Sequence, residues 1–550
     1  MRNRSLSALS LCLLLIFTAC NKAGKTGLLI PKDAGMVLHL NLSSLSSKLS
    51  WKEIQQTAWY AEAQKQSTDS LAKKLLADPS SSGIDMDGSL VMFMKRQGNK
   101  GYLAFEGNLK NVEQFKNTIH QAGEGKVTIG KEGHLNYALM ENNENGVLYF
   151  NDKLFVFIAD ASDPKGISQN KSIPQWGAPQ SYPLDSLKHF AKTTFSLQGS
   201  SLLDNDKRFA DLIAEKADIH YWINSGSLYG GMMAGPLAMM KIGDVLADNI
   251  TMGTASFESG RIVAEGRQFY GKKLADLFKK YGGKELSADV LARLPEGDVL
   301  AAFAMNYNPE GIKEFLKLLG VDGMANAALG QLGVNFTLDD FVNANAGELA
   351  FALTGFSIVE KPSAITIEGD NGPQVIPYTD KKPEMKYVFG VSVNDRASFQ
   401  KLIEAVQVLK SSGMSALQTD STGARQMSKM QDKWFALGSS EAEADAFLTG
   451  NKKPSYASAF SGHNGGGFVD LQKLITAAAA GSKDTASKKA FDVSTAFWKD
   501  MNMYWDVKGG TATSHFEINL ADHKTNALKQ LNKYIDEMYK AIPPETAEFE

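Results

Sequence analysis

Side chains that could bind a metal or act as a nucleophile occur in this 550-residue chain, but their spacing matches no familiar site. No two of the eight histidines stand two or four positions apart, the spacings that place a pair on one metal ion. Ser70 and Lys73 have the Ser-x-x-Lys spacing of penicillin-recognising enzymes, but the Lys-Thr-Gly motif that should follow lies upstream at 25–27. The acid pairs at 85–88 and 204–207 lack the other ligands of a calcium loop. We therefore predict no catalytic residue, no metal site and no cofactor, and keep open a hydrolase whose site has no short motif.

One cysteine has a defined chemistry. A positively charged start precedes an apolar run over 6–19, which suits a signal peptide but is shorter than the roughly 20 residues that span a bilayer. The run ends in FTAC (17–20), which resembles the box at which bacterial lipoproteins are cleaved and acylated. We therefore predict a signal peptide over 1–19, lipidation of Cys20, and a lipid anchor and tether over 20–29. An ordinary signal peptide with an incidental cysteine is the alternative.

Composition agrees with an exported globular protein. Cys12 lies in the predicted leader, so the mature chain would form no disulfide and would depend on its apolar core. Apolar residues make up 43% of the chain and charged residues 22%, as in globular domains. The formal net charge is −3 and the basic residues are dispersed, which argues against a nucleic-acid partner.

A methionine- and glycine-rich segment over 225–243 stands out from its surroundings. It follows Asn224, a helix-capping residue type, but its five glycines and its proline make a poor helix. Methionine side chains are flexible and recur at adaptable binding surfaces. The segment is either a loosely wound, buried helix or a binding surface. For the second reading the candidate binding residues are Met232, Met233, Met239 and Met240.

The chain repeats itself. Five segments of its first half recur in the same order in its second half: IPKDAGMVLHLN (30–41) and LPEGDVLAAFAMN (294–306), DGSLVMFM (87–94) and AGELAFAL (346–353), GYLAFEGNLKNVEQFKNTI (101–119) and KYVFGVSVNDRASFQKLI (386–403), NDKLFVFIADAS (151–162) and QDKWFALGSSEA (431–442), and SFESGRIVAEGRQFYGKKLADLFKKY (256–281) and DVKGGTATSHFEINLADHKTNALKQLNKY (506–534). We predict a tandem duplication with halves 30–290 and 291–540, followed by a flexible tail over 541–550.

The same segments predict the fold class. Asn41, Asn224, Asn308 and Asp470 each end an apolar strand and are placed to cap the helix that follows. Period-two strands and hairpin signals occur together with helices of three- and four-residue apolar spacing. We therefore expect an α+β fold in which each half has a largely antiparallel sheet and helices on one face.

Residues 357–385 have no counterpart in the first half. The stretch is rich in proline, and AITIE and VIP are expected to form two arms of a projecting hairpin with GDNGP at its tip. The insertion is either a plain surface elaboration or a recognition arm.

As a whole, the chain resembles the lipoproteins of Bacteroidetes grouped as a domain of unknown function, DUF4836. The resemblance rests on Cys20, IPKDAGMVLHLNLSSL, LPEGDVLAAFAMNYN and FESGRIV, and it implies no activity and no catalytic residue. In that phylum, acidic residues just after the lipidated cysteine favour display on the cell surface. CNKAGKTG has none, which favours an outer-membrane anchor that faces the periplasm, with exposure on the cell surface as the alternative.

These observations favour a non-catalytic binding or scaffold protein at the outer membrane. Its expected partners are the membrane, through the N-terminal lipid, and an envelope protein. A carrier of an apolar ligand between the halves is the alternative, along with the hydrolase already mentioned.

Overall fold

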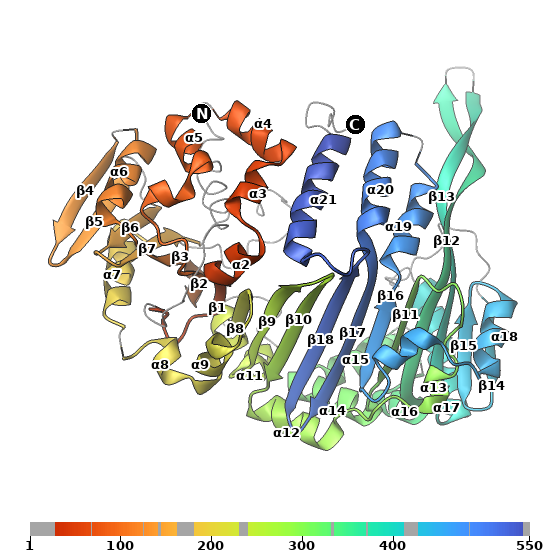
Figure 1. The fold of residues 1–550 in the computed structure, drawn as a ribbon. Helices are drawn as coiled ribbons and strands as arrows, with labels where there is room; N and C mark the ends of the chain where they lie inside the picture. The colour runs from red at the N-terminus through yellow and green to blue at the C-terminus, as the bar shows by residue number, and fades with distance from the viewer. Residues whose placement is uncertain are drawn as a thin grey trace. The chain divides into compact units, whose positions relative to one another are not determined.

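The computed structural model describes residues 28–542 except 68, 125, 141–144, 162–180, 198, 230–239, 332–334, 370–371, 412–426 and 483 (Figure 1). It divides into two compact units, which we name unit 1 and unit 2. Unit 1 comprises the described residues as far as Lys272 together with Thr525–Asp536. Unit 2 comprises Lys273–Lys524 and the described residues from Glu537 onward.

The sheet of unit 1 is antiparallel throughout its described pairings. From one edge to the other its strands are β10 (Arg261–Phe269), β9 (Ile250–Glu258), β8 (Ile219–Asn224), β1 (Met36–Asn41), β2 (Ser89–Gln97), β3 (Lys100–Asn108), β7 (Leu154–Asp160), β6 (Gly146–Phe150), β5 (Leu135–Met140) and β4 (Val127–Glu132).

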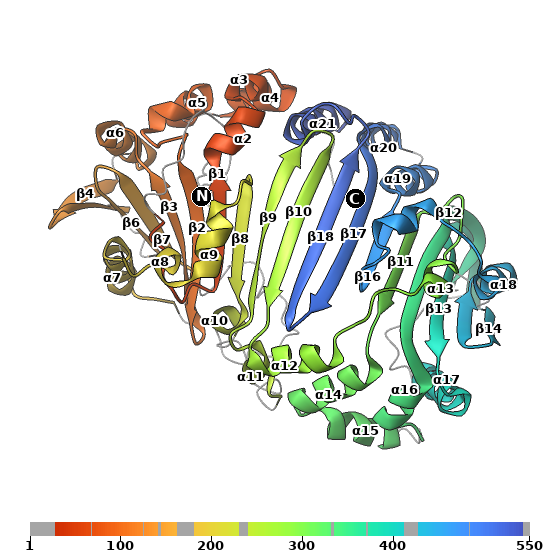
Figure 2. The same cartoon turned by 60° about the horizontal axis from the view of Figure 1, so that its bottom comes forward.

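The sheet of unit 2 is also antiparallel in its described pairings, and Figure 2 shows its strands side by side. Their order is β18 (Thr511–Leu520), β17 (Trp498–Lys508), β16 (Gly465–Val469), β11 (Ala301–Asn306), β12 (Asn345–Gly369), β13 (Gly372–Val393), β15 (Trp434–Gly438) and β14 (Met427–Gln431). When the strands of each unit are numbered by their position along the chain, these strands have the same order across the sheet as the strands of unit 1 from β10 to β6.

The four predicted caps are present in the structure. The side chains of Asn41, Asn224, Asn308 and Asp470 each accept a hydrogen bond from the backbone amide three residues later. The helices that follow are α2 (Leu42–Lys48), α10 (Ser225–Tyr229), α14 (Pro309–Leu319) and α19 (Leu471–Ala479). The strand–cap–helix units are thus confirmed, because an Asx side chain satisfies amides that an α-helix leaves unpaired at its start.

The remaining helices complete the two units. Unit 1 holds α3 (Trp51–Gln55), α4 (Ala58–Gln66), α5 (Ser70–Ala77), α6 (Val112–Ala122), α7 (Leu184–Phe195), α8 (Leu202–Asn205), α9 (Lys207–Ala214) and α11 (Ile242–Leu246). Unit 2 holds α12 (Lys272–Tyr281) from its second residue on, α13 (Ala288–Leu291), α15 (Asp322–Gln331), α16 (Leu338–Ala344), α17 (Arg396–Ser411), α18 (Glu441–Thr449) and α20 (Thr485–Phe497). Two short 3₁₀ helices lie at Pro79–Ser82 and Ser455–Ala459.

Helices cover both faces of each sheet, so the expectation of helices on one face is wrong. In unit 1, Leu187 of α7 packs in the core on one face, whereas Phe115 of α6 contacts Phe155 on the other. In unit 2, Phe447 of α18 lies against Trp434, and α17 covers the opposite face. The reason is that the central strands carry apolar side chains on both faces, and each face must be shielded from water.

The long hairpin β12–β13 contains the insertion over 357–385. Its two predicted arms pair with each other, with Ile365 opposite Ile376, and Figure 1 shows the hairpin rising beyond the neighbouring strands. Lys381 Nζ donates to the carbonyl oxygen of Gly481 at 2.8 Å, which fixes the lower part of the arm. Nearer the tip the side chains of Ile365 and Ile376 are exposed.

Two helices belong to a different unit from the strand that precedes them. Helix α12 follows β10 of unit 1, but almost all of it packs within unit 2. Helix α21 (Ala527–Ala541) follows β18 of unit 2, but its residues up to Asp536 pack within unit 1, where Leu528 joins the cluster around Trp51. Helix α12 is therefore the first element of unit 2, whereas most of α21 returns to unit 1 after the last strand of unit 2.

Candidate functional site

The residues singled out in the sequence fall mostly outside the described part of the chain. Cys20, Met232, Met233 and Met239 lie outside it. Met240 is half-buried in the turn before α11. The structure thus does not test either reading of the methionine segment.

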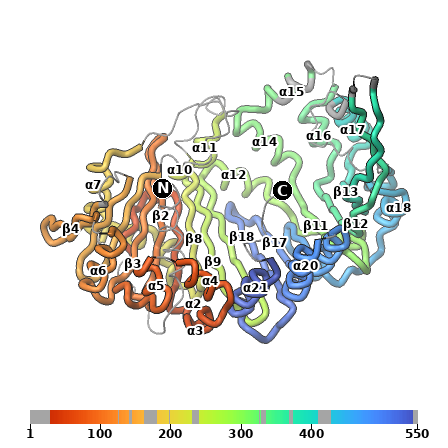
Figure 3. Tube along the Cα trace, turned by 90° about the horizontal axis from the view of Figure 1, so that it is seen from above, coloured from red at the N-terminus to blue at the C-terminus, as the bar shows by residue number. Residues whose placement is uncertain are grey.

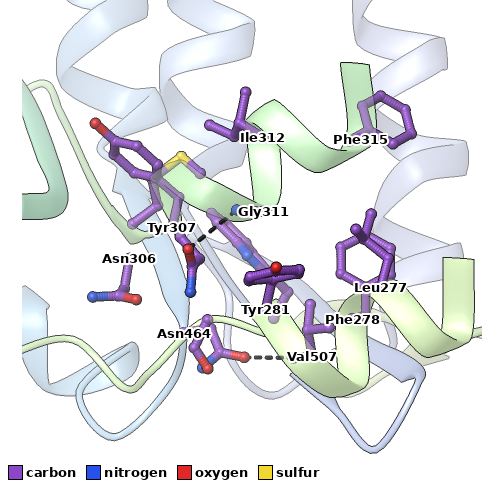
Figure 4. A pocket seen from close by; sticks show the side chains of 14 residues that line it. Leu277, Phe278, Tyr281, Asn306, Tyr307, Gly311, Ile312, Phe315, Asn464 and Val507 are labelled. Carbon is purple, nitrogen blue, oxygen red and sulfur yellow. Dashed lines mark hydrogen bonds between the residues drawn. The ribbon is translucent and has the colours of Figure 1, made fainter. Parts of the chain in front are cut away.

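A pocket in unit 2 is a candidate site. It has a volume of about 270 Å³ and lies between α12, α14, the end of β11 and the start of β16 and end of β17 (Figure 4). Figure 3 shows α12 and α14 next to each other. The volume is close to the ~300 Å³ at which pockets for small organic molecules begin.

Helix α14 forms one wall. Asn308 caps it, Pro309 occupies its first position, and Gly320 ends it with a φ of 73°. Its apolar stripe includes Ile312 and Phe315, yet no residue of this helix is fully buried and Ile312 is 37% exposed. An amphipathic helix normally buries its apolar stripe, whereas Ile312 of α14 lines the pocket with its side chain partly exposed.

Helix α12 forms the facing wall. Leu277, Phe278 and Tyr281 present their side chains to the pocket (Figure 4). Gly311 permits this arrangement, because a Cβ atom there would lie 2.8 Å from the Cβ of Tyr281. The close approach of α12 to α14 therefore requires glycine at this position.

The floor is formed by the sheet. Met305 of β11 and Trp505 and Val507 of β17 line it. The indole of Trp505 lies over Gly465, where a Cβ atom would come within 2.2 Å of the ring. A glycine in this strand thus makes room for an aromatic side chain to lie flat on the sheet.

Polar groups at the rim are used mainly to hold the backbone. Asn464 accepts from the amide of Val507 and donates to the carbonyl of Gly283 at 3.1 Å. Asn306 accepts from the amide of Lys284 at 2.8 Å. Of the fourteen described residues that line the pocket, none carries a carboxylate or an ammonium group. The arrangement can desolvate an apolar group and supplies no charged acid or base.

A histidine–aspartate pair supports the turn beneath the pocket. His463 Nδ1 lies 2.7 Å from Asp506 Oδ2, and Asp506 Oδ1 accepts from the amide of Asn464 at 3.1 Å. The ring of His463 stacks on Tyr504 with centroids 3.9 Å apart. Since Tyr504 and Asp506 alternate with Trp505 and Val507 along β17, the pair lies on the sheet face away from the pocket. It positions Asn464, which lies directly before β16.

A second polar network lies in the core of unit 1. His220 Nε2 is 3.0 Å from the carbonyl oxygen of Glu215 and must donate to it, so His220 Nδ1 accepts from His39 Nδ1, 3.0 Å away. His39 Nε2 then accepts from the hydroxyl of Ser89 at 2.8 Å. Every ring nitrogen is satisfied with both imidazoles neutral. Burial, and then the neighbouring His220, lower the pKa of His39 to about 3.

The place in unit 1 that corresponds to the pocket is filled. Leu40 and Met305 are the penultimate residues of β1 and β11, and through the strand pairings Phe257 of β9 corresponds to Val507 of β17. In unit 1, Leu40 and Phe257 pack against a buried cluster of Leu45, Leu49, Trp51, Ile54, Tyr60, Leu76 and Leu528. In unit 1 the side chains of Trp51 and Ile54 of α3 thus pack in the cluster beside Leu40 and Phe257.

Sequence reasoning missed the pocket residues. The stripes Ile312–Phe315 and Leu277–Phe278–Tyr281 were visible as helix faces, but their spacing does not reveal whether another element covers them. In the described part of the chain, no helix combines the length and hydropathy needed to cross a membrane. The described residues also hold no group of three or more His, Cys, Asp or Glu side chains arranged for a metal ion.

Comparisons with known proteins give a family and little beyond it. No curated protein matches the chain. Two solved structures, crystal forms III and IV of TP0453, each show 10% identity, with TM-scores of 0.25 and 0.24; they cover 47% and 46% of this chain, and 87% and 84% of their own. The family described as Domain of unknown function (DUF4836) matches residues 27–364, which is more than half of the chain. The protein is therefore a member of the DUF4836 family.

Proposed function

We propose that this protein is a non-catalytic binding protein of the bacterial envelope whose ligand site is the pocket of unit 2. The observation that carries the proposal is the open apolar pocket between α12 and α14, at a place where unit 1 is solidly packed. A folded protein gains stability by filling such a space. Leaving it open in one unit is what binding an apolar group would require. Because the pocket belongs to unit 2 alone, we place the ligand there rather than between the halves.

The proposal includes a tandem duplication. The shared strand order of the two units, the caps at matching places and the five recurring segments support it. After duplication, one copy filled the space beside its β1 strand with α3, and the other kept it open.

The proposal also includes a lipid anchor at the outer membrane of a Bacteroidetes bacterium, facing the periplasm. The FTAC box and Cys20 support it. Several acyl chains together anchor stably, since each buried methylene contributes ~0.8 kcal/mol. Cys20→Ser should release the protein into the soluble periplasmic fraction. Retention of this variant in membranes after a high-salt wash would contradict the anchor without touching the pocket.

The pocket is tested with an uncharged aromatic dye, N-phenylnaphthylamine, whose fluorescence rises in apolar surroundings. The protein is residues 20–550 with Cys20→Ser, so that no lipid competes for the dye. Ile312→Glu introduces a carboxylate into the wall of the pocket, and we expect it to weaken dye binding about tenfold or more, because the charge must lose water when the dye enters. Since Ile312 is 37% exposed, the fold should tolerate the change.

Val406→Glu is the matched control. Val406 is an aliphatic side chain on α17, 47% exposed and outside the pocket. Equal dye affinity of the two variants, or no saturable dye binding by the parent protein, would refute the assignment of the site.

A further inference from the structure

The filled space of unit 1 shows which chemistry suits the open space of unit 2. In unit 1 the filling element is α3, a helix of one and a half turns that starts at a capping box made by Ser50 and Glu53. Trp51 and Ile54 stand three positions apart and so lie on one face of the helix. Both are buried in the cluster with Leu528 of α21. The indole Nε1 of Trp51 donates to the carbonyl oxygen of Leu76 at 2.9 Å.

A charge contact orients α3 on the helix beside it. Glu53 lies between Trp51 and Ile54 in sequence and forms an ion pair with Lys529 of α21 at 2.6 Å. A hydrogen bond from Lys529 is the largest cause of the low pKa of Glu53, about 2. The element that fills the space of unit 1 therefore combines one aromatic anchor, one aliphatic anchor and one carboxylate at the rim.

Among the described residues of unit 2, no helix fills the pocket as α3 fills the matching place in unit 1, and the surroundings offer complementary features. Helix α12 takes the place that α21 has in unit 1 and carries two exposed cations, Lys279 and Lys280. The ammonium group of Lys280 lies 4.8 Å from the ring centroid of Tyr281, which lines the pocket. The acid nearest to Lys279 is Asp276, at 3.8 Å, so this cation is only loosely paired. Across the pocket, Ile312 and Phe315 of α14 supply the apolar wall.

We propose that the pocket of unit 2 binds a short amphipathic helix of another protein, which presents an aromatic and an aliphatic side chain three positions apart and an acidic residue between them. The inference rests on the proposed function and names its partner class. This helix of the other protein would fill the pocket of unit 2 with its side chains, as α3 fills the matching place in unit 1. A helix that starts at its own capping box loses less conformational freedom on binding than an unstructured peptide.

The segment of unit 1 that contains α3 supplies the peptide used as the probe. A fluorescein-labelled peptide with the sequence of residues 50–60, SWKEIQQTAWY, is titrated with the 20–550 Cys20→Ser protein and followed by fluorescence anisotropy. Three peptide variants match it: one with alanine in place of both Trp51 and Ile54, one with Glu53→Lys, and one with the same composition in scrambled order. Ile312→Glu and Val406→Glu serve again as the site variant and its control.

We expect saturable binding that falls about tenfold or more for the double-alanine peptide, for the scrambled peptide and for the Ile312→Glu protein, with Val406→Glu unchanged. The Glu53→Lys peptide should bind several-fold more weakly, and the parent peptide should lose affinity as salt is raised. Binding weaker than about 1 mM, the loose end of specific recognition, or binding that Ile312→Glu does not alter, would overturn the inference. If the dye still binds in the pocket while the peptide does not, the proposed function stands and only the helical partner is wrong. If neither the dye nor the peptide binds, the proposed function and the helical partner are both wrong.

Discussion

The buried carboxyl group of Glu106 makes the stability of unit 1 depend on pH. Glu106 of β3 is 1% exposed and stands between Val91 and Val156, which are equally buried. Its two oxygens accept from the amide of Leu29 at 3.1 and 3.0 Å, where the chain enters the core. Burial raises the pKa of Glu106 from 4.5 to about 8, and the hydrogen bond from Leu29 only partly opposes this.

The direction of the effect follows from proton binding. Between pH 4.5 and 8 the folded protein keeps a proton on Glu106 that the unfolded chain has lost, so the free energy of unfolding falls as pH rises through this window. Each unit of pKa difference is worth about 1.4 kcal/mol. The full window thus removes on the order of 5 kcal/mol. Above pH 8 the loss is complete.

Glu106→Gln should remove this dependence, because its amide oxygen can still accept from Leu29 while carrying no charge. We expect the variant to match the parent protein within about 1 kcal/mol at pH 5 and to exceed it by several kcal/mol at pH 8. Hydrogen exchange across a urea series, with fragments from β3 read separately, measures the effect in unit 1. Fragments from β13 provide a reference within unit 2. Glu113→Gln, at a side chain that is 73% exposed, is the control variant. A difference between Glu106→Gln and the parent that does not grow from pH 5 to pH 8 would show that the carboxylate is ionised and solvated, and the reasoning would fail.

Three further predictions concern other buried contacts. Acidification from pH 7 to pH 5 should lower the free energy of unfolding of unit 1 by about 2 kcal/mol through His39 alone, because its lowered pKa means that only the unfolded chain binds the proton. His39→Gln should flatten the dependence of melting temperature on pH, and identical pH profiles of the variant and the parent protein would contradict this. Trp51→Ala should destabilise unit 1 by about 3–5 kcal/mol, and added indole should partly restore the melting temperature by refilling the space, whereas no response to indole would mean that the site had collapsed. Gly311→Ala should cost about 1–3 kcal/mol by pressing a methyl group on Tyr281, with faster amide exchange in α12; unchanged exchange there would show that the helices separate freely.

Local signals in the sequence were sufficient for much of the fold. The capping side chains and the repeated segments fix where strands hand over to helices, because the cap hydrogen bonds involve neighbouring residues only. The sequence could not show that helices cover both sheet faces. Alternation along β3 places Tyr102 on one face and Phe105 on the other, and either could have been solvent-facing. The pocket was further out of reach, because it depends on the approach of Tyr281 to Gly311, on the path of α12 into unit 2, and on whether an element such as α3 fills the space.

The placement of α12 and α21 has a consequence for biosynthesis. Unit 1 lacks Thr525–Asp536 until nearly the whole polypeptide has left the ribosome, so it cannot complete its core while the second half is still being made. Domains usually fold in order as they leave the ribosome, but unit 1 cannot complete its fold until the residues of α21 up to Asp536 have been made. During that interval the cluster around Trp51 lacks Leu528 of α21, so part of its apolar surface stays uncovered. If the chain is exported as we propose, such a delay would favour passage through a narrow translocation channel, because unit 1 would complete its core only after α21 had followed it.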